Sequence, residues 1–296
     1  MPESPVLTLR GISKRFGAVQ ALKGFDLEVH SGEVVALVGD NGAGKSTAVK
    51  AIAGVNPPDE GVIEWEGRPV SINRPHDAQN LGIATVYQDL ALCDNLDVVA
   101  NLFLGRELRH FGVLDEVRMD QRAQELLDTL SIRIPSVRIP VASLSGGQRQ
   151  TVAIARSLIG EPKVVILDEP TAALGVEQTA EVLDLVERLR ERGLGTILIS
   201  HNMVDVMAVA DRIAVMRLGR NNGFFDRRST TTEEIISAIT GATDSAVTRR
   251  QARKREEERW APTETARAAR TAPGCPTTPS PRNRRRVPYL PWTRVS

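Results

Sequence analysis

Short apolar runs alternate with segments of helical periodicity over most of this chain. Residues 34–38, 83–87, 163–167, 196–200 and 212–216 are apolar almost throughout, which is typical of strands buried on both faces. Between them, apolar residues recur at helical spacing in 48–53, 176–192 and 202–210. Buried strands that alternate with helices predict a parallel sheet covered on both faces, so the expected fold class is α/β.

Two segments depart from this pattern. Residues 6–9, 25–29 and 61–67 alternate between apolar and polar side chains, which predicts a small antiparallel β layer near the N-terminus. From about 89 to 161 the strands stop, and helices are expected at 97–104, 120–130 and 148–159. This segment is predicted to be an α-helical subdomain inserted into the α/β core. A final helix is expected at 230–239.

The composition changes after Gly241. Residues 245–296 contain 13 Lys and Arg against 4 Asp and Glu, a net charge of +9, which leaves −8 for the rest of a chain whose total is +1. Residues 249–259 could form a charged helix, but from residue 261 Pro, Thr, Ala and Arg dominate without an apolar face. We predict a folded domain over 1–244 and a basic, Pro- and Arg-rich disordered tail over 245–296.

The chain shows neither a secretory signal nor a membrane-spanning run. Its first residues lack a basic and an apolar region, and no apolar stretch approaches the roughly 18 residues that cross a bilayer. Cys93 and Cys275 are far apart and form no C-x-x-C motif. We therefore expect a cytosolic chain without structural disulfides or a zinc site.

The strongest motif follows the first buried strand. Residues 39–46 fit the pattern G-x-x-x-x-G-K-[ST], and a helix follows at once, which is the context of a phosphate-binding loop. Loop N–H groups and the helix N-terminus bind phosphate oxygens, Lys45 adds a positive charge, and the Ser46 hydroxyl is a ligand for Mg²⁺. The expected nucleotide contacts are Gly39, Asp40, Asn41, Gly42, Ala43, Gly44, Lys45, Ser46 and Thr47.

An acidic pair ends the strand at 163–167. The sequence V-V-I-L-D-E-P over 164–170 places Asp168 and Glu169 at the carboxyl end of a core strand, where α/β sheets bind ligands. Asp168 is expected to hold Mg²⁺ through water, and Glu169 to orient and deprotonate an attacking water. An acidic turn after a strand is common by itself, but the phosphate-binding loop upstream favours the functional interpretation.

The pentapeptide L-S-G-G-Q at 144–148 forms a second potential anion site. By composition, it arises by chance in on the order of one in a few thousand chains of this length. Ser145, Gly146 and Gly147 precede the helix that begins at Gln148, so a hydroxyl, free N–H groups and a helix N-terminus are available to an anion. One nucleotide does not need two such sites. A head-to-tail pair of subunits does, because the second site would contact the γ-phosphate bound to the other subunit.

In this order, the motifs resemble those of the ATP-binding-cassette (ABC) ATPases over about residues 6–241. The resemblance implies a P-loop NTPase (RecA-like) core, with 39–47 as Walker A, 145–148 as the ATP-contacting signature, Asp168 as the Walker B aspartate and Glu169 as the catalytic base. Gln88 would contact Mg²⁺ and the attacking water, and His201 the γ-phosphate. Phe16 would stack on adenine.

One position differs from the family pattern. After Thr171 the family usually has Ser-Ala-Leu-Asp, whereas residues 172–175 of this chain are A-A-L-G. Gly175 therefore replaces an aspartate that crosses the dimer interface in the family. We expect ATP binding to be retained, while the change at Gly175 leaves open how the interface couples to hydrolysis.

Three stretches narrow the resemblance to the ATPases of bacterial ribose, xylose and fructose importers. They are P-T-A-A-L-G-V at 170–176, S-H-N-M at 200–203, and L-C-D-N-L-D-V at 92–98, the region that docks the membrane subunit's coupling helix in such transporters. The resemblance implies an ATPase at the cytoplasmic face of the membrane that uses ATP and Mg²⁺ to power monosaccharide uptake. The implied partners are integral membrane permease subunits, a second copy of the ATPase and, indirectly, a periplasmic or lipid-anchored sugar-binding protein.

Two other functions remain open from the sequence. A soluble cassette ATPase could act on ribosomes or nucleic acid, and the basic tail is its one supporting feature. Such proteins usually have two cassettes or a long coiled-coil insertion, which this chain lacks, so we expect no specific nucleic acid partner. An ATP-sensing regulatory cassette is the third hypothesis, and Gly175 is the feature that would favour it.

Overall fold

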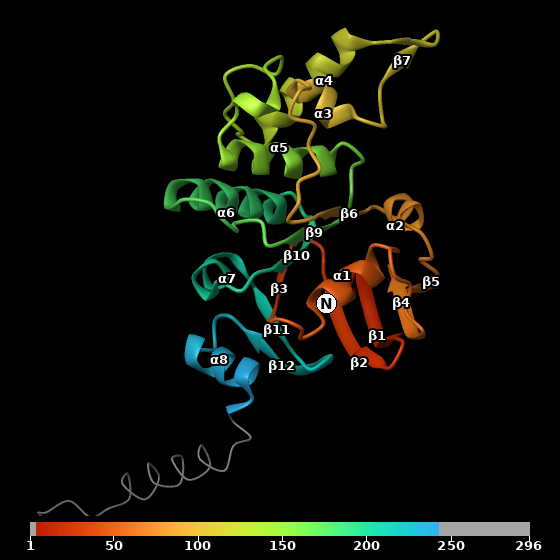
Figure 1. Ribbon diagram of the computed structural model, residues 1–296, viewed down its shortest axis with the longest axis vertical. Coiled ribbons are helices and arrows are strands. Elements are labelled where there is room, and N and C mark those ends of the chain that lie inside the picture. Colours follow the sequence, from red (N-terminus) through yellow and green to blue (C-terminus); the bar gives the residue numbers. More distant parts are fainter. Residues whose placement is uncertain (1–3, 243–296) are drawn as a thin grey trace, which may run out of the picture. The chain divides into compact units, whose positions relative to one another are not determined.

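The computed structural model describes residues 4–242, and within them the central sheet has six strands (Figure 1). The order is β12–β11–β3–β10–β9–β6, with β12 antiparallel at one edge and the other five strands parallel. The bounds are β3 (Val34–Gly39), β6 (Ile83–Val86), β9 (Val164–Asp168), β10 (Gly195–Ile199), β11 (Arg212–Arg217) and β12 (Arg220–Asp226). The predicted parallel sheet is confirmed. The predicted tail at 245–296, including 249–259, lies outside the described residues.

Helices and a second sheet cover the two faces of the parallel sheet. In β9, Val165 and Leu167 pack towards α5 and α6, whereas Val164 and Ile166 pack towards α1 and the smaller sheet. Because both alternating sets are buried, the strand is apolar throughout, which explains the signal in the sequence. The core helices are α1 (Lys45–Ile52), α2 (Pro75–Leu81), α6 (Val176–Glu191), α7 (Met203–Val209) and α8 (Thr232–Thr240).

The smaller sheet is antiparallel, as predicted, but its strands are longer than the alternation indicates. Its order is β2–β1–β4–β5. Register shifts follow Leu9, Ile12 and Lys14 in β1. Each shift changes which side chains face inward, so the strict alternation is lost although the strand continues. The bounds are β1 (Leu7–Phe16), β2 (Val19–Val29), β4 (Glu60–Trp65) and β5 (Arg68–Val70).

The predicted helical subdomain is also present, and Figure 1 shows its elements gathered at one end of the molecule. Its helices pack with α6 and one face of the parallel sheet in a continuous apolar core. A short hairpin, not predicted, joins the first two helices. The elements are α3 (Val98–Phe103), β7 (Arg109–His110), β8 (Val113–Leu114), α4 (Glu116–Thr129), a 3₁₀ turn (Val141–Ser143) and α5 (Gly146–Leu158).

Two further elements have no clear hydrophobic pattern. The α2 helix is short and begins at a proline, and the Asp77 carboxylate accepts hydrogen bonds from the N–H groups of Asn73 and Arg74. The edge strand β12 contains Gly223 at φ 150°, and its residues alternate between exposed and half-buried. Both were missed because neither buries a full apolar face.

A buried asparagine shapes the loop that precedes α3. Asn101 is fully buried, its Oδ1 accepts from the N–H of Cys93 at 2.7 Å, and its Nδ2 donates to the carbonyls of Cys93, Leu96 and Asp97. One side chain thus satisfies four backbone groups of a segment that has no regular structure. The loop over 93–97 is therefore held in one conformation.

Within residues 4–242, no helix combines the length and the apolar character needed to cross a membrane.

We predict that Asn101→Ala lowers the free energy of unfolding by about 2–3 kcal/mol, because the backbone groups that it satisfies would lose their partner. Amide hydrogen exchange should rise at Cys93, whose N–H donates to Asn101. Denaturant titration and exchange measured by mass spectrometry test this. Asn95→Ala, an exposed position in the same loop, is the matched control. Equal stability of the two variants would contradict the prediction.

Candidate functional site

The phosphate-binding loop leaves the end of β3 in a conformation that requires glycine. Gly39 has φ 155°, and a Cβ there would collide with the carbonyl oxygen of Met216 on β11. Gly44 has φ 110°, and a Cβ would lie 2.9 Å from the carbonyl oxygen of Ala21 on β2. The loop thus passes close to the backbone of two neighbouring strands. This geometry lets its N–H groups line a concave surface ahead of α1.

Lys45 is the first residue of α1, and its side chain folds back over the loop. Its ammonium donates to the carbonyl oxygens of Gly39 at 2.6 Å and Asp40 at 3.1 Å. The residue is only 8% exposed, so the charge is held at the base of the loop. Because the ammonium is already held over the loop, it can bind the oxygens of a phosphate there without first moving through solvent.

The acidic pair lies at the end of β9, as predicted. Burial raises the pKa of Asp168, the adjacent Glu169 carboxylate raises it further, and Lys45 and Lys50 act in the opposite direction. Glu169 has φ 52°, which is left-handed and strained for a residue other than glycine. Its N–H donates to the carbonyl of Ile199 at 2.9 Å, which fixes the turn against β10.

The Glu169 carboxylate contacts His201. Its Oε2 lies 2.7 Å from Nδ1 of His201, which follows the end of β10. The His201 side chain is 71% exposed, while that of Glu169 is 17% exposed. The predicted base and the predicted switch histidine are therefore within hydrogen-bonding distance, and the exposed ring can reach a group outside the subunit.

Asp205, which the sequence analysis did not single out, joins the two loops that carry this pair. It is 3% exposed. Its Oδ2 accepts from the Thr171 hydroxyl at 2.6 Å, and its Oδ1 accepts from the side-chain amide of Asn202 at 2.9 Å. Thr171 lies two residues after Glu169, and Asn202 directly follows His201. The sequence signal was faint, an acidic residue in the first turn of α7.

These elements surround a cavity of about 440 Å³. The phosphate-binding loop from Asn41 to Thr47 lines it, together with Gln88, Asp168 and Glu169. Lys23 of β2 also lines it and was not predicted. The structure therefore brings together the residues expected to bind phosphate and Mg²⁺ and to activate water.

Phe16 lies near this cavity but is not part of its lining. It ends β1, is 46% exposed, and pairs across the hairpin with Val19, which does line the cavity. The Lys14 ammonium lies 5.8 Å from the centre of its ring. Its stacking on adenine stays a prediction.

The signature residues are also outside the cavity, on the helical subdomain. Ser145 is the N-cap of α5, where its hydroxyl accepts from the N–H of Gln148 at 3.2 Å and Gln148 Oε1 accepts from the N–H of Ser145 at 3.0 Å. Gly147 is packed against Gln178 of α6, since a Cβ at Gly147 would lie 2.9 Å from the Cβ of Gln178. None of the four signature residues, 145–148, lines the nucleotide cavity of the same subunit, so their contact with ATP stays a prediction.

Comparison with known proteins identifies the family. A family model described as ABC transporter matches residues 22–172. The chain is similar to the xylose/arabinose import ATP-binding protein XylG of Sulfolobus acidocaldarius, with 46% identity over 80% of this chain and 94% of that protein. The chain belongs to the ABC transporter family. As an ABC ATPase it binds and hydrolyses ATP.

Two further comparisons agree with this ABC assignment. The fructose import ATP-binding protein FrcA of Rhizobium meliloti is 46% identical over 82% of this chain and 96% of its own length. Among solved structures, a dimeric post-hydrolysis state of the ATP-binding cassette MJ0796 bound to ADP and Pi has a TM-score of 0.64 at 25% identity, covering 76% of this chain and all of that one. The ABC cassette fold expected from the sequence is confirmed.

The residues of this ABC cassette fit a Mg²⁺ ion. Ser46, Gln88 and Asp168 are oxygen donors, which Mg²⁺ prefers, and all three line the same cavity. Within residues 4–242, no three His, Cys, Asp or Glu side chains form a metal cluster. Nucleotide-bound Mg²⁺ does not need one, because phosphate and water supply its other ligands. A nearby cation would also stabilise the ionised form of Asp168.

We predict that Asp205→Ala lowers kcat roughly tenfold or more with little change in ATP affinity, because the loops of Glu169 and His201 lose their common anchor. Steady-state ATPase assays and nucleotide titration separate the two effects. Thr171→Val provides a double-mutant cycle, in which the two effects on kcat should not add, since both remove the same contact. A kcat within twofold of the unchanged chain for Asp205→Ala would contradict the positioning role.

Proposed function

We propose that this ABC ATPase is the energy-coupling subunit of a monosaccharide importer, and that two copies bind two MgATP between them. The observation that carries the proposal is the separation of the signature from the nucleotide cavity. The cavity contains the Walker loop, Gln88, Asp168 and Glu169, whereas Ser145 caps a helix elsewhere on the surface. A second subunit placed head to tail would supply the missing contacts.

In this arrangement each side chain has a definite role. Lys45 and the loop N–H groups bind the β- and γ-phosphates, Gln88 and Glu169 orient the attacking water, and Glu169 accepts its proton. His201 contacts the γ-phosphate, and Ser145 to Gln148 of the other copy close over it. Mg²⁺, held by Ser46, Gln88 and Asp168, would neutralise charge on the phosphate oxygens. The solved dimer of a related cassette with ADP and Pi supports this pairing.

The transported class is inferred from the relatives. Their names refer to import of xylose or arabinose in one case and of fructose in the other, at the same 46% identity. Because the chain is equally similar to the two relatives, the comparison favours a monosaccharide as the transported substrate but does not distinguish a pentose from a hexose. The chain would then lie at the cytoplasmic face of a membrane, and the ordered loop at 93–97 and its neighbours would contact the permease. A periplasmic or lipid-anchored sugar-binding protein would act on the other side.

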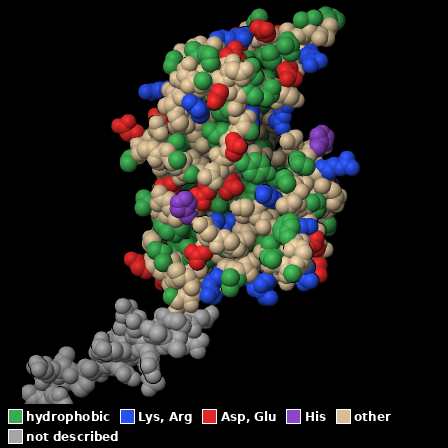
Figure 2. Space-filling view, in the orientation of Figure 1, with side chains coloured by type: hydrophobic (Ala, Val, Ile, Leu, Met, Phe, Trp, Pro, Cys, Tyr) green, Lys and Arg blue, Asp and Glu red, His purple; other side chains and the backbone are tan. Residues whose placement is uncertain are grey.

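The other two functions have less support. Acidic and basic side chains are interspersed over the face of the described residues seen in Figure 2, so this face has no broad basic surface for nucleic acid. A purely regulatory cassette would not need a base, yet Glu169 occupies a strained turn beside Asp168 and His201. We therefore retain the transport ATPase as the proposal.

We predict that Glu169→Gln keeps ATP binding, lowers ATP hydrolysis at least a hundredfold and yields an ATP-dependent dimer, because the water loses its base while the phosphate contacts remain. Lys45→Ala is the contrasting variant and should lose nucleotide binding itself. Equilibrium titration, phosphate release and light scattering measure these effects. Normal turnover by Glu169→Gln would exclude this base assignment.

We predict that the tagged full chain, expressed in its source organism, co-purifies with an integral membrane protein and raises monosaccharide uptake. The Glu169→Gln variant should still co-purify with that protein but should abolish uptake, because it removes ATP hydrolysis and leaves assembly with the membrane protein intact. Radiolabelled pentoses and hexoses identify the transported class. Co-purification with ribosomes or nucleic acid instead would favour the second function.

A further inference from the structure

Leu218 is an exposed apolar residue in a strained turn at the nucleotide cavity. It directly follows β11, has φ 50°, is 69% exposed and lines the cavity. The left-handed region is unfavourable for a bulky side chain, whereas Gly and Asn adopt it readily. A leucine here therefore costs conformational energy and leaves an apolar side chain in solvent. Such strain is typical of positions that contact a ligand.

The turn is held between the phosphate-binding loop and β2. The N–H of Gly219 donates to the carbonyl of Ala43 at 2.8 Å, and the carbonyl of Gly219 accepts from the N–H of Lys23 at 2.8 Å. A Cβ at Gly219 would lie 2.6 Å from the carbonyl oxygen of Ala21, so the position after Leu218 requires glycine. The surrounding backbone therefore fixes the turn although its leucine is strained.

The strand that follows the turn is fixed to β2 as well. Figure 1 shows β12 next to β2, and Asn221 of β12 exchanges two hydrogen bonds with the backbone of Asp26 on β2. Its Oδ1 accepts from the N–H at 2.8 Å, and its Nδ2 donates to the carbonyl at 2.9 Å. Leu218 is thus presented by a turn that is hydrogen-bonded on both sides.

The wall that carries Leu218 is apolar where it is exposed. Val19 of β2 lines the same cavity and is 67% exposed. It pairs across the hairpin with Phe16, so exposed apolar surface continues beyond the cavity. Phosphate groups gain nothing from such a surface, whereas the face of a nucleobase is apolar and gains from leaving water.

The order of the strands indicates which end of a nucleotide lies at this wall. In the sheet, β11 and β10 flank β3 on opposite sides, and β9 lies beyond β10. Leu218 therefore follows a strand on one side of the phosphate-binding loop, while Asp168 and Glu169 end a strand on the other side. A triphosphate that crosses the loop with its γ-phosphate towards Glu169 places its base on the side of Leu218.

We propose that Leu218 packs against the face of the nucleobase of bound ATP, and that it sets the affinity for the nucleotide without taking part in hydrolysis. An apolar contact makes no hydrogen bond to the ring edge, so it favours a nucleotide over a bare polyphosphate without distinguishing one purine from another. The inference rests on ATP binding by the ABC family and does not depend on the transported substrate.

Three variants separate this contact from a structural role. Leu218→Asn removes the apolar side chain and suits the backbone, because Asn tolerates the left-handed region. Leu218→Met keeps an apolar side chain of similar volume. Phe111→Asn is the matched control, since Phe111 also has φ 50°, is 96% exposed and lies in the β7–β8 turn outside the cavity. Denaturant titration should show that none of the three variants is destabilised.

We predict that Leu218→Asn raises the KM for MgATP about three- to tenfold with kcat within about twofold, because a leucine side chain no longer leaves water when the base binds. Magnesium tripolyphosphate has no base, so its inhibition constant should stay within about twofold. The KM values of Leu218→Met and Phe111→Asn should also stay within about twofold. Steady-state formation of ADP, with and without tripolyphosphate, gives all of these constants.

Three results would overturn the inference. An equal rise in the tripolyphosphate constant of Leu218→Asn would show that the residue acts through the phosphate-binding loop. An unchanged KM in Leu218→Asn would exclude the base contact, and weaker ATP-dependent dimerisation in light scattering would then assign the exposed leucine to the surface between two copies. Equal losses in Leu218→Asn and Leu218→Met would show that apolar character is not recognised. Failure to find a membrane partner or sugar uptake would overturn the proposed transport function and leave this contact standing.

Discussion

The site depends on one geometric constraint, the common direction of the parallel strands. The strands β3, β10, β9 and β6 lie side by side and run the same way, so their carboxyl ends meet at one edge of the sheet. The phosphate-binding loop leaves the first, His201 the second, the Asp168–Glu169 pair the third, and Gln88 the fourth. The loop, Gln88, Asp168 and Glu169 thereby line one cavity, and His201 lies beside it through its contact with Glu169. Each loop contributes a separate chemical function because each follows a different strand.

This constraint explains how much the sequence could predict. A strand buried on both faces must be apolar throughout, so the five parallel strands and the residues at their ends were readable from the chain alone. Three elements could not be predicted in this way: the bulged β1 strand, the α2 helix and the β7–β8 hairpin. Bulges change which β1 side chains face inward, and contacts elsewhere in the fold stabilise the other two, so none of them shows a regular hydrophobic period in the sequence. Asp205 was missed for a related reason. Its partner Thr171 is 34 positions away in sequence, and only folding brings the two together.

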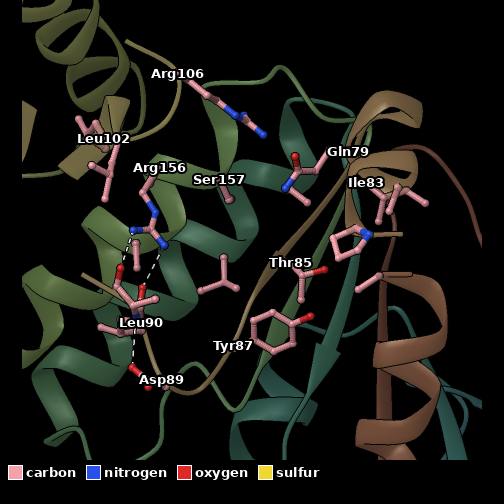
Figure 3. A pocket seen from close by; sticks show the side chains of 18 residues that line it. Gln79, Ile83, Thr85, Tyr87, Asp89, Leu90, Leu102, Arg106, Arg156 and Ser157 are labelled. Carbon is pink, nitrogen blue, oxygen red and sulfur yellow. Dashed lines mark hydrogen bonds between the residues drawn. The ribbon is translucent and has the colours of Figure 1, made fainter. Parts of the chain in front are cut away.

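The segment from Ile83 to Asn101 lies between the nucleotide cavity and a second cavity, of about 360 Å³, between the core and the helical subdomain (Figure 3). Gln88 lines the first, Tyr87 and Asp89 line the second, and Arg156 of the signature helix donates to the carbonyls of Leu90 and Ala91 that follow. Asn101 then fixes the loop that leads into α3. The chain between the two cavities is therefore short and is held by hydrogen bonds from Arg156 and Asn101.

The glycine at position 175 can be interpreted in the same terms. Its φ is −73°, and a Cβ there would meet no atom within 4 Å, so neither backbone strain nor packing inside the subunit requires glycine. An aspartate would therefore fit at this position without strain inside the subunit. Within the subunit, Gln178 connects this position to the signature: its Oε1 accepts from the N–H of Gly175 at 3.4 Å, and its side chain packs against Gly147. The start of α6 thus packs against the start of the signature helix without a carboxylate at 175, so this contact inside the subunit does not depend on the aspartate usual in the family.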